Sequence, residues 1–96
     1  MAQHTVVVRP DGSVNMQSVK AKRPNSGTGT QGDEVQWNGA TTYWIVFPGD
    51  SPFAGNSFQV GSGFHSVQEN AGTGRHNYDV RTSAGVLLAD PDVDVE

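Results

Sequence analysis

The sequence predicts an all-β protein, a two-sheet Greek-key β-sandwich of seven to eight strands. Three observations lead to this prediction. Short runs of alternating apolar and polar residues recur along the chain, as in half-buried strands. Turn-forming residues separate these runs, and the chain contains 12 glycines and 5 prolines. No stretch shows the apolar spacing of an amphipathic helix. Short strands divided by turns are typical of sandwiches and barrels.

The chain has 96 residues, which is enough for one domain, and we expect residues 1–96 to form a single sandwich. A chain of this size buries only about 60–65% of its unfolded surface. There is no cysteine, so no disulfide supplements the core. Stability must then come from apolar packing between strands, for which two Trp, two Tyr and four Phe supply the bulk.

The first third of the chain predicts two strands and a loop. Residues 5–9 are β-branched and end at a Pro-Asp-Gly turn at 10–12. Residues 13–22 alternate and predict a return strand, so the two strands could pair as a hairpin. Residues 24–32 contain no apolar side chain, which predicts a mobile loop. A glycine-rich loop can hold phosphate, but here a strand follows instead of the helix that such a site needs.

The middle of the chain carries the strands with the largest side chains. Residues 34–38 place Trp37 on their apolar face and run into Asn-Gly at 38–39, a tight-turn signal. Residues 41–47 form the most apolar segment and are apolar on both faces. Such a strand is central in its sheet, or a loop covers one of its faces.

Three aromatic residues in this region allow two interpretations. Trp37, Tyr43 and Trp44 could stack on a carbohydrate if they were exposed together. A small sandwich also needs aromatic bulk in its core. We therefore favour core positions for Trp37 and for at least one of the other two.

The second half predicts short strands. Residues 57–60 alternate regularly, whereas the apolar residues of 64–68 are out of phase, so that a bulge is present or Phe64 belongs to the preceding turn. Residues 77–82 place two apolar side chains on one face. Residues 86–88, Val-Leu-Leu, predict a short buried run.

The end of the chain shows the clearest alternation. Val93 and Val95 face one way, and the opposite face carries an acidic row: Asp90, Asp92, Asp94 and Glu96. Carboxylates can collect calcium, but alternate strand positions do not wrap an ion as a loop does. We favour a role in solubility and in blocking edge-to-edge pairing, with Arg9 or Lys22 as cross-strand partners.

Three segments together resemble the cupredoxin family, the small blue-copper β-sandwiches. Gly32-Asp33-Glu34-Val35-Gln36-Trp37-Asn38 is similar to the family's strand before its first copper histidine. Tyr78-Asp79-Val80 resembles the family's Tyr-x-Cys, and Asp90-Pro91-Asp92-Val93-Asp94-Val95 resembles its closing strand. The order and spacing of these segments agree over residues 30–95.

The resemblance implies where copper ligands would lie, and those positions are empty. Val80 stands in the place of the thiolate, residues 42–44 contain no histidine, and residues 81–89 contain neither His nor Met. A blue-copper site requires a thiolate. We therefore expect a metal-free cupredoxin-like binding or assembly module without catalytic activity and without a cofactor.

Such a module would bind a protein partner or associate with copies of itself. Loops on a rigid sandwich usually carry its contacts, here residues 24–32, 48–56 and 70–76. Residues 6–8, three consecutive valines, could also pair with a strand of another chain.

The alternative is a non-blue metal-binding protein or metalloenzyme. His65 and His76 flank one loop and could approach each other across adjacent strands. Together with Glu69 or Asp79 they could bind a divalent metal. Their spacing matches no established ligand motif, which favours exposed polar positions.

Composition argues against other classes of partner. The net charge is −4 with a pI near 5.1, whereas nucleic-acid binding needs a basic surface. The one basic cluster, Lys20, Lys22 and Arg23, predicts a solvated strand end beside a loop. No apolar run approaches the roughly 20 residues that span a bilayer. No signal peptide is visible, and the absence of cysteine fits a reducing compartment, so a cytoplasmic location is favoured.

Overall fold

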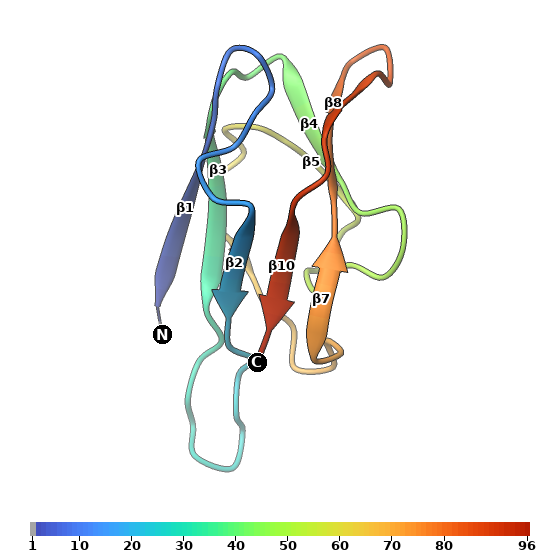
Figure 1. The fold of residues 1–96 in the computed structure, drawn as a ribbon. Coiled ribbons are helices and arrows are strands. Elements are labelled where there is room, and N and C mark those ends of the chain that lie inside the picture. The colour runs from blue at the N-terminus through green and yellow to red at the C-terminus, as the bar shows by residue number, and fades with distance from the viewer. Residues whose placement is uncertain (1) are drawn as a thin grey trace.

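The computed structural model describes residues 2–96, and strands, turns and loops account for all of them (Figure 1). No helix occurs in this range, and therefore none that could cross a membrane. The predicted all-β class is confirmed. The ten strands are β1 (Gln3–Val8), β2 (Ser18–Ala21), β3 (Glu34–Gly39), β4 (Tyr43–Val46), β5 (Ser57–Gln59), β6 (His65–Ser66), β7 (Gly74–Asn77), β8 (Asp79–Thr82), β9 (Leu87–Ala89) and β10 (Asp92–Val95).

The strands form three sheets, with the orders β1-β3-β6, β2-β10-β7 and β5-β4-β8-β9. Only Tyr78 separates β7 from β8, and only two residues separate β9 from β10. At that point the Tyr78 amide donates a hydrogen bond to the Pro91 carbonyl (2.9 Å). The four strands therefore make one long bent hairpin that belongs to one sheet in its lower half and to another in its upper half (Figure 1).

Inward-facing side chains of all three sheets meet in a single core. Trp37 lies at its centre, 2% exposed, which confirms its predicted core position. Five rings surround it with centroids 5.4–6.5 Å away, those of Phe47, Phe53, Phe58, His65 and Tyr78. Most of these contacts are edge to face, the arrangement that the charge distribution of aromatic rings favours.

Two predictions about individual strands are confirmed. β4 lies between β5 and β8, so the most apolar segment is central in its sheet. Ile45 and Phe47 are buried on its inner side, and Trp44 is exposed on the outer side. Phe64 is exposed and precedes β6, so it belongs to the turn rather than to the strand.

The hairpin predicted from residues 5–9 and 13–22 is wrong beyond its turn. One bridge joins Val8 to Val14 next to the Pro-Asp-Gly turn. β1 then pairs in parallel with β3, and β2 pairs in parallel with β10. The chain crosses from one sheet to another between β1 and β2, which lets both strands bury their apolar faces in the same core.

The prediction that residues 86–88 are buried is also wrong. All three side chains are exposed. β9 has β8 as its only neighbour in the sheet and therefore forms an edge. An apolar run at an edge cannot turn every side chain toward the core, because successive residues of a strand point to opposite faces.

The acidic row does not protect a sheet edge, because β10 lies between β2 and β7. Of its predicted cross-strand partners, Arg9 is wrong, because it lies on neither neighbouring strand. Lys22 does lie beside Glu96, since the Glu96 amide donates to the Ala21 carbonyl (2.9 Å) and the Arg23 amide donates to the Glu96 carbonyl (3.4 Å). The residues in register with Asp94 are Lys20 on one side and Arg75 on the other. Positive charge on both neighbouring strands explains how a central strand can carry acidic side chains.

The molecule is elongated, with extents of 42 × 22 × 19 Å. The C-terminus and the 24–32 loop lie at one end, and the turn of the β8–β9 hairpin lies at the other (Figure 1). The 24–32 loop contains one bridge, between Asn25 and Thr30. Its mobility stays a prediction.

Candidate functional site

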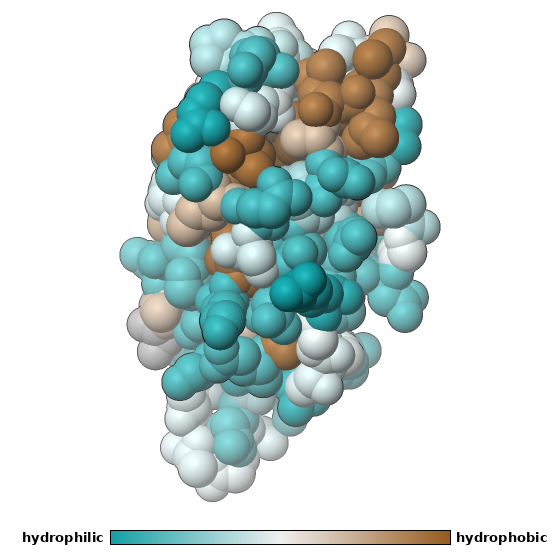
Figure 2. Space-filling model, viewed as in Figure 1, coloured by the Kyte–Doolittle hydropathy of each residue, from teal (hydrophilic) through white to brown (hydrophobic). Residues whose placement is uncertain are grey.

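An apolar surface lies at the end of the molecule that carries the β8–β9 turn (Figure 2). Strand register places two of its residues, Trp44 and Leu87, on the same face of the sheet. Trp44 of β4 is opposite Arg81 of β8, which is opposite Leu87 of β9. Residues directly opposite one another share a face of the sheet, here the outer one. The exposed fractions are 37% for Trp44, 56% for Val86, 50% for Leu87 and 36% for Leu88, and these four residues are the apolar surface.

The hairpin beneath the apolar surface is closed by Thr82 and Gly85. The Thr82 amide donates to the Val86 carbonyl (3.0 Å), and the Val86 amide donates to Thr82 Oγ1 (3.1 Å). Gly85 has a φ of 86°, which L residues rarely adopt. These bonds hold the three apolar residues in a defined position instead of leaving them in a loose loop.

One arginine lies within the apolar surface, and it is neutralised locally. Arg81 donates through Nε (2.9 Å) and Nη2 (2.6 Å) to Asp79 Oδ2, and through Nη1 to the Gly85 carbonyl (2.9 Å). Because the Asp79 carboxylate lies this close, its negative charge offsets the positive charge of the Arg81 guanidinium. Arg81 therefore contributes its aliphatic stem between Trp44 and Leu87 without an unpaired charge.

Leu88 connects the apolar surface to the Pro-Asp-Gly turn. The register shifts at Val80 and Arg81, which leaves Leu88 in a bulge. A Cβ added to Gly12 would lie 2.5 Å from Leu88 Cδ1, so the leucine rests on the bare backbone of that turn. The turn thus packs against the Leu88 side chain.

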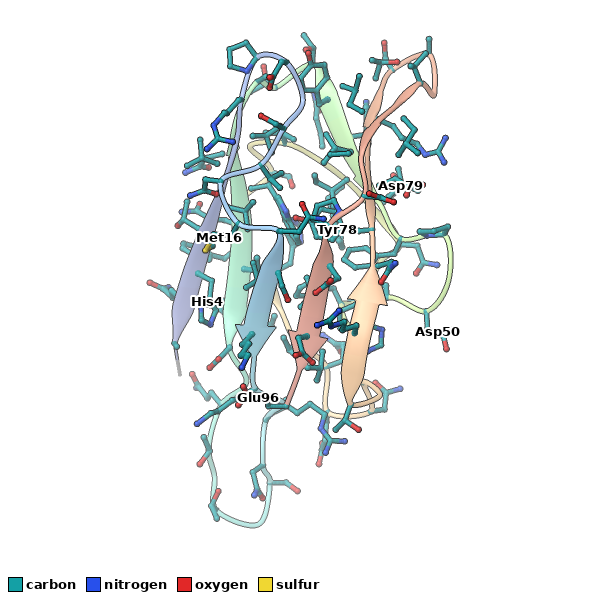
Figure 3. All side chains as sticks on the ribbon, in the orientation of Figure 1. His4, Met16, Asp50, Tyr78, Asp79 and Glu96 are labelled. Atoms are coloured by element: carbon teal, nitrogen blue, oxygen red, sulfur yellow. The ribbon has the colours of Figure 1, made fainter. Side chains whose placement is uncertain are left out.

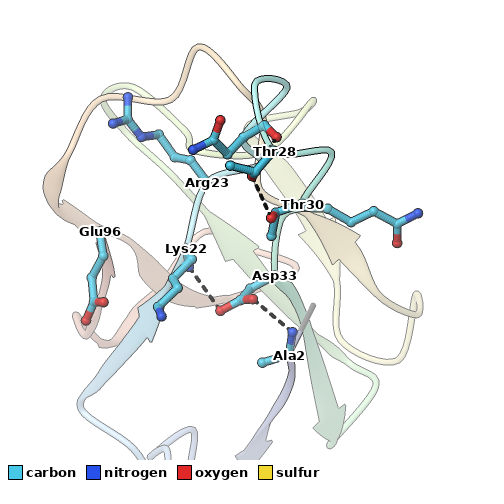
Figure 4. A pocket seen from close by; sticks show the side chains of 9 residues that line it. Ala2, Lys22, Arg23, Thr28, Thr30, Asp33 and Glu96 are labelled. Carbon is cyan, nitrogen blue, oxygen red and sulfur yellow. Dashed lines mark hydrogen bonds between the residues drawn. The ribbon is translucent and has the colours of Figure 1, made fainter.

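The opposite end of the molecule is polar and holds a hollow of about 650 Å³ (Figure 4). The lining residues are Ala2, Lys22, Arg23, Asn25, Thr28, Thr30, Gln31, Asp33 and Glu96. Lys22 and Arg23 belong to the basic cluster, which is exposed as predicted. Glu96 brings the opposite charge to the same hollow, so its charges favour neither anions nor cations.

Asp33 is the best-connected side chain at this end. Its Oδ1 accepts from the Ala2 amide (2.9 Å), and its Oδ2 accepts from the Lys22 amide (3.0 Å) and lies 3.2 Å from His4 Nε2. Burial opposes its ionisation, but these hydrogen bonds together outweigh burial and hold the pKa of Asp33 below its usual value. His4 is part of β1, and its ring is held by this carboxylate.

The two histidines of the metal hypothesis have separate surroundings. His65 stacks on Phe58 with ring centroids 3.8 Å apart, and its Nε2 lies 3.0 Å from Ser62 Oγ. Burial lowers the pKa of His65. Both ring nitrogens of His76 face carbonyl oxygens, those of Asp50 (2.9 Å) and Gly72 (2.7 Å). Neither histidine is directed at the other.

The carboxylates of the metal hypothesis are also apart from the histidines. Asp79 is paired with Arg81, and Glu69 lies beside Arg23 along a surface hollow of about 350 Å³. Figure 3 shows Asp79 in the upper half of the long bent hairpin and Glu96 at its lower end, so the acidic C-terminal residue is far from Asp79 as well. Within residues 2–96, no group of three or more His, Asp or Glu side chains could hold a metal ion. The structure therefore does not bring His65, His76, Glu69 and Asp79 together.

Tyr78 makes the one polar contact inside the aromatic core. Trp37 Nε1 donates a hydrogen bond to its hydroxyl (3.1 Å), and both side chains are buried. Burial raises the pKa of Tyr78 to about 12, and the bond from Trp37 opposes this only in part. The ionised side chain is thus strongly disfavoured in the folded protein.

We expect Tyr78 to make the protein less stable in alkali. Its pKa is about 12 in the folded protein against 10.0 for a free tyrosine side chain, so the unfolded state loses the proton first. Stability should fall as the pH rises from 10 toward 12, by at most about 1.4 kcal/mol per pH unit from this group. Urea unfolding at a series of pH values measures the slope of the free energy of unfolding against pH.

Two variants separate this effect from general alkaline damage. Tyr78→Phe should reduce the slope, although it lowers stability at every pH because Trp37 Nε1 loses its acceptor. Tyr43→Phe keeps Tyr78 and should keep the slope. An equal slope in wild type and Tyr78→Phe would show that Tyr78 is not responsible.

The apolar surface was not predicted from the sequence as a functional candidate. The available signal was the turn at Ser83-Ala84-Gly85 directly before three apolar residues. A short strand after a tight turn often lies at the edge of its sheet. When such a strand is apolar on both faces, the apolar side chains of one face are exposed. Trp44 gave the second signal, because β4 was predicted to be apolar on both faces.

Comparison with protein-family models, with curated proteins and with solved structures finds no match for this chain.

Proposed function

We propose that this chain is a metal-free, cupredoxin-like Greek-key β-sandwich that acts as a protein-binding or assembly module without catalytic activity. Its contact surface in this proposal is the apolar surface of Trp44, Val86, Leu87 and Leu88. The observation that carries the proposal is the exposure of Val86, Leu87 and Leu88 on a hydrogen-bonded hairpin, with Trp44 exposed on β4 of the same sheet. Contiguous exposed apolar side chains on a soluble domain mark sites of interaction.

The sandwich arrangement is supported by the strand order. The segment similar to the family's first ligand strand is β3, in the β1-β3-β6 sheet, and the chain then crosses to β4 in another sheet. The long bent hairpin connects the other two sheets, and their inward side chains share the core with β1 and β3. Two layers around one core, with the chain passing repeatedly between them, fit a Greek-key sandwich.

The absence of copper ligands is consistent with how the corresponding residues pack. Val80, in the place of the family's thiolate, is fully buried and in register with Ile45. Residues 81–89, in the place of the ligand loop, form the β8–β9 hairpin. This end of the molecule is thus filled by apolar side chains, which supports a role in contact rather than in metal chemistry.

The apolar surface replaces the contact regions expected from sequence. Residues 6–8 are poorly suited to pairing with another strand, because the outward amide and carbonyl of Val7 are already bonded to Asn15, through Oδ1 (2.8 Å) and the Asn15 amide (3.1 Å). In the loop at 70–76, His76 is engaged by two carbonyl oxygens. No metal-binding function is proposed, since no arrangement of the described side chains favours one.

A contact surface should be dispensable for folding. We expect Val86→Ser/Leu87→Ser to change the free energy of unfolding by less than about 1 kcal/mol, because both side chains are half exposed. Val80→Ser, on the neighbouring strand but fully buried, should cost about 2–4 kcal/mol. Denaturant unfolding of the three proteins measures this, and a large loss in the surface variant would assign these residues to folding instead.

The binding role itself is tested with a photo-crosslinking amino acid at position 87. We expect a discrete crosslinked product when the protein is irradiated in extracts of its native cells, identified by mass spectrometry. The matched control carries the same group at Val7, which is 42% exposed but lies on β1. A discrete adduct at position 87 alone supports the proposal, and the absence of any adduct there, or equal adducts at both positions, contradicts it.

A further inference from the structure

Residues 61–66 form a short segment that is anchored at both ends and has one inward side chain. The flanking residues Val60 and Val67 are each 2% exposed and belong to the core. Between them, Phe64 is 40% exposed, and both serines of the segment face solvent. Among these six residues, His65 alone contributes a side chain to the aromatic cluster of the core. Its ring therefore fixes the middle of the segment on the core.

The His65 ring is surrounded by uncharged groups. Its centroid lies 3.8 Å from that of Phe58 in a stacked arrangement, and 6.1 and 6.2 Å from those of Trp37 and Phe53. Its Nε2 lies 3.0 Å from Ser62 Oγ. These neighbours keep water from one side of the ring and offer no ion pair in exchange. Burial of this kind disfavours the charged form of a histidine.

Within residues 2–96, the charged side chains of the elements packed against His65 lie elsewhere. They are Glu34 of β3, Asp50 of the segment before β5 and Glu69 of the segment after β6. Glu34 accepts a hydrogen bond from Ser66 Oγ (3.4 Å), on the face of β3 and β6 opposite to His65. Asp50 and Glu69 line surface hollows with Arg75 and Arg23, respectively, and His65 lines neither hollow. No carboxylate is therefore placed to stabilise a charged His65 ring.

The backbone of the segment is held by few bonds and contains two glycines in unusual conformations. Gly61 and Gly63 have φ values of 89° and 99°, and a Cβ at Gly63 would have no atom within 4 Å. β6 pairs with only two residues of β3. The Gly61 amide donates to the Trp37 carbonyl (2.7 Å), and the Ser62 amide donates to the Gln59 carbonyl (3.1 Å). Segments with so few contacts open locally while the rest of the protein stays folded.

From these observations we infer that His65 is a pH-sensitive anchor, and that protonation of its ring releases residues 61–66 from the aromatic core in mildly acidic solution. The charged ring moves from the faces of Phe58 and Trp37 into water, and these two core side chains become accessible. This device is separate from the apolar surface, so it stands or falls independently of the proposed function.

The direction of the pH dependence follows from the burial of the ring. Burial lowers the pKa of His65 from the 6.5 of a free histidine side chain, so the open segment takes up a proton more readily than the closed one. The stabilisation of the closed form is therefore complete above pH 6.5. It is lost as the pH falls through the lower pKa of the closed form.

Amide hydrogen exchange followed by NMR between about pH 7.5 and about pH 4.5, corrected for the intrinsic effect of pH on exchange, tests the inference. We expect the protection of the Gly61 and Ser62 amides to decrease below pH 6.5. The Tyr78 amide, bonded to the Pro91 carbonyl, should keep its protection. The lower limit of this range stays above 3.8, so that the titration of Asp33 does not contribute.

Two variants assign the effect to one ring. His65→Phe keeps a ring that can stack on Phe58 but cannot be protonated, so the protection of both amides should no longer depend on pH. His76→Asn, the matched control, removes a histidine from β7 and should retain the wild-type pH dependence. Titration of the His65 ring by NMR in the wild-type protein needs no variant and should give a pKa below 6.5.

Five results would each overturn the inference. Three concern amide exchange: protection that does not change with pH in the wild type, an equal loss of protection in His65→Phe, and a loss that the Tyr78 amide shares, which would indicate global unfolding. A flat profile in His76→Asn would assign the titration to that histidine instead. A pKa of His65 at or above 6.5 would show that attraction of the charged ring to the face of Phe58 outweighs burial.

Discussion

Gly39→Ala should destabilise the protein by more than about 3 kcal/mol, because it combines backbone strain with a steric clash. Gly39 closes β3 with a φ of 126°, which residues with a side chain rarely adopt. A Cβ at this position would lie 2.1 Å from the Val8 carbonyl oxygen. That oxygen accepts the Ala40 amide (3.2 Å) at the end of the parallel β1·β3 pair, so the clash cannot be relieved without opening the pair.

Two other glycines serve as controls that separate the two causes. Gly49→Ala adds a methyl group with no atom within 4 Å and no positive φ, and should lie within about 0.5 kcal/mol of wild type. Gly63 has a φ of 99° and open space around it, so Gly63→Ala should cost only the strain, about 1–2 kcal/mol. Guanidinium unfolding ranks the three variants. If Gly39→Ala cost no more than Gly63→Ala, the close approach of β1 and β3 would not matter.

Gly39 also shows what the sequence could and could not predict about the fold. The turn predicted at Asn38-Gly39 is misplaced, because both residues belong to β3 and the turn lies at Thr41-Thr42, where the Tyr43 amide donates to the Ala40 carbonyl (3.3 Å). The two strands that flank this turn were predicted at nearly the right residues. Their partners were not, since β3 pairs with β1 and β6 whereas β4 pairs with β5 and β8. Alternation of apolar residues reports which face of a strand is buried, but contains no information about which distant strand lies beside it.

The same limit explains the incorrect hairpin between residues 5–9 and 13–22. A Pro-Asp-Gly turn favours a reversal of the chain, and the bridge between Val8 and Val14 shows that the reversal occurs. Continuing the hairpin would have left β10 without its parallel neighbour β2. Burial of two strands in a common core outweighs the local preference of one turn.

The candidate site was harder to predict than the fold. His65 and His76 were grouped because they flank one loop, yet His65 stacks on Phe58 and His76 is bonded to the carbonyls of Asp50 and Gly72. Proximity in sequence said nothing about the direction of either ring. Leu87 was misplaced for a related reason, because hydrophobicity predicts that a residue prefers burial but not that its strand has a second neighbour.

Asp33→Asn should be the second strongly destabilising change, by about 2–4 kcal/mol at neutral pH. The carboxylate accepts hydrogen bonds from the Ala2 and Lys22 amides on different oxygens and contacts His4. An asparagine has one accepting oxygen, and its NH₂ group would face one of the two amides as a second donor. A buried donor without an acceptor costs free energy that the lost bond alone does not account for.

The position of Asp33 in the fold amplifies this loss. Its own amide donates to the Lys22 carbonyl (2.9 Å), and its carbonyl accepts the Val67 amide (3.0 Å). One residue therefore connects the start of β1, the end of β2 and the segment after β6 at the polar end of the molecule. Asp90→Asn is the matched control, since it removes the same charge from an exposed side chain, and it should stay within about 0.5 kcal/mol of wild type.

The pH dependence distinguishes a hydrogen-bonded carboxylate from a merely buried one. The pKa of Asp33 is lowered in the folded protein from the 3.8 of a free aspartate side chain, so the unfolded state binds the proton more readily. Its contribution is complete at pH values above 3.8 and is lost as the pH falls through the lower folded value. Urea unfolding between neutral and acidic pH should therefore give a flatter curve for Asp33→Asn than for Asp90→Asn, with the two variants converging in acid. Parallel curves would mean that Asp33 titrates alike in both states, and that the three contacts on its carboxylate do not stabilise the charged form.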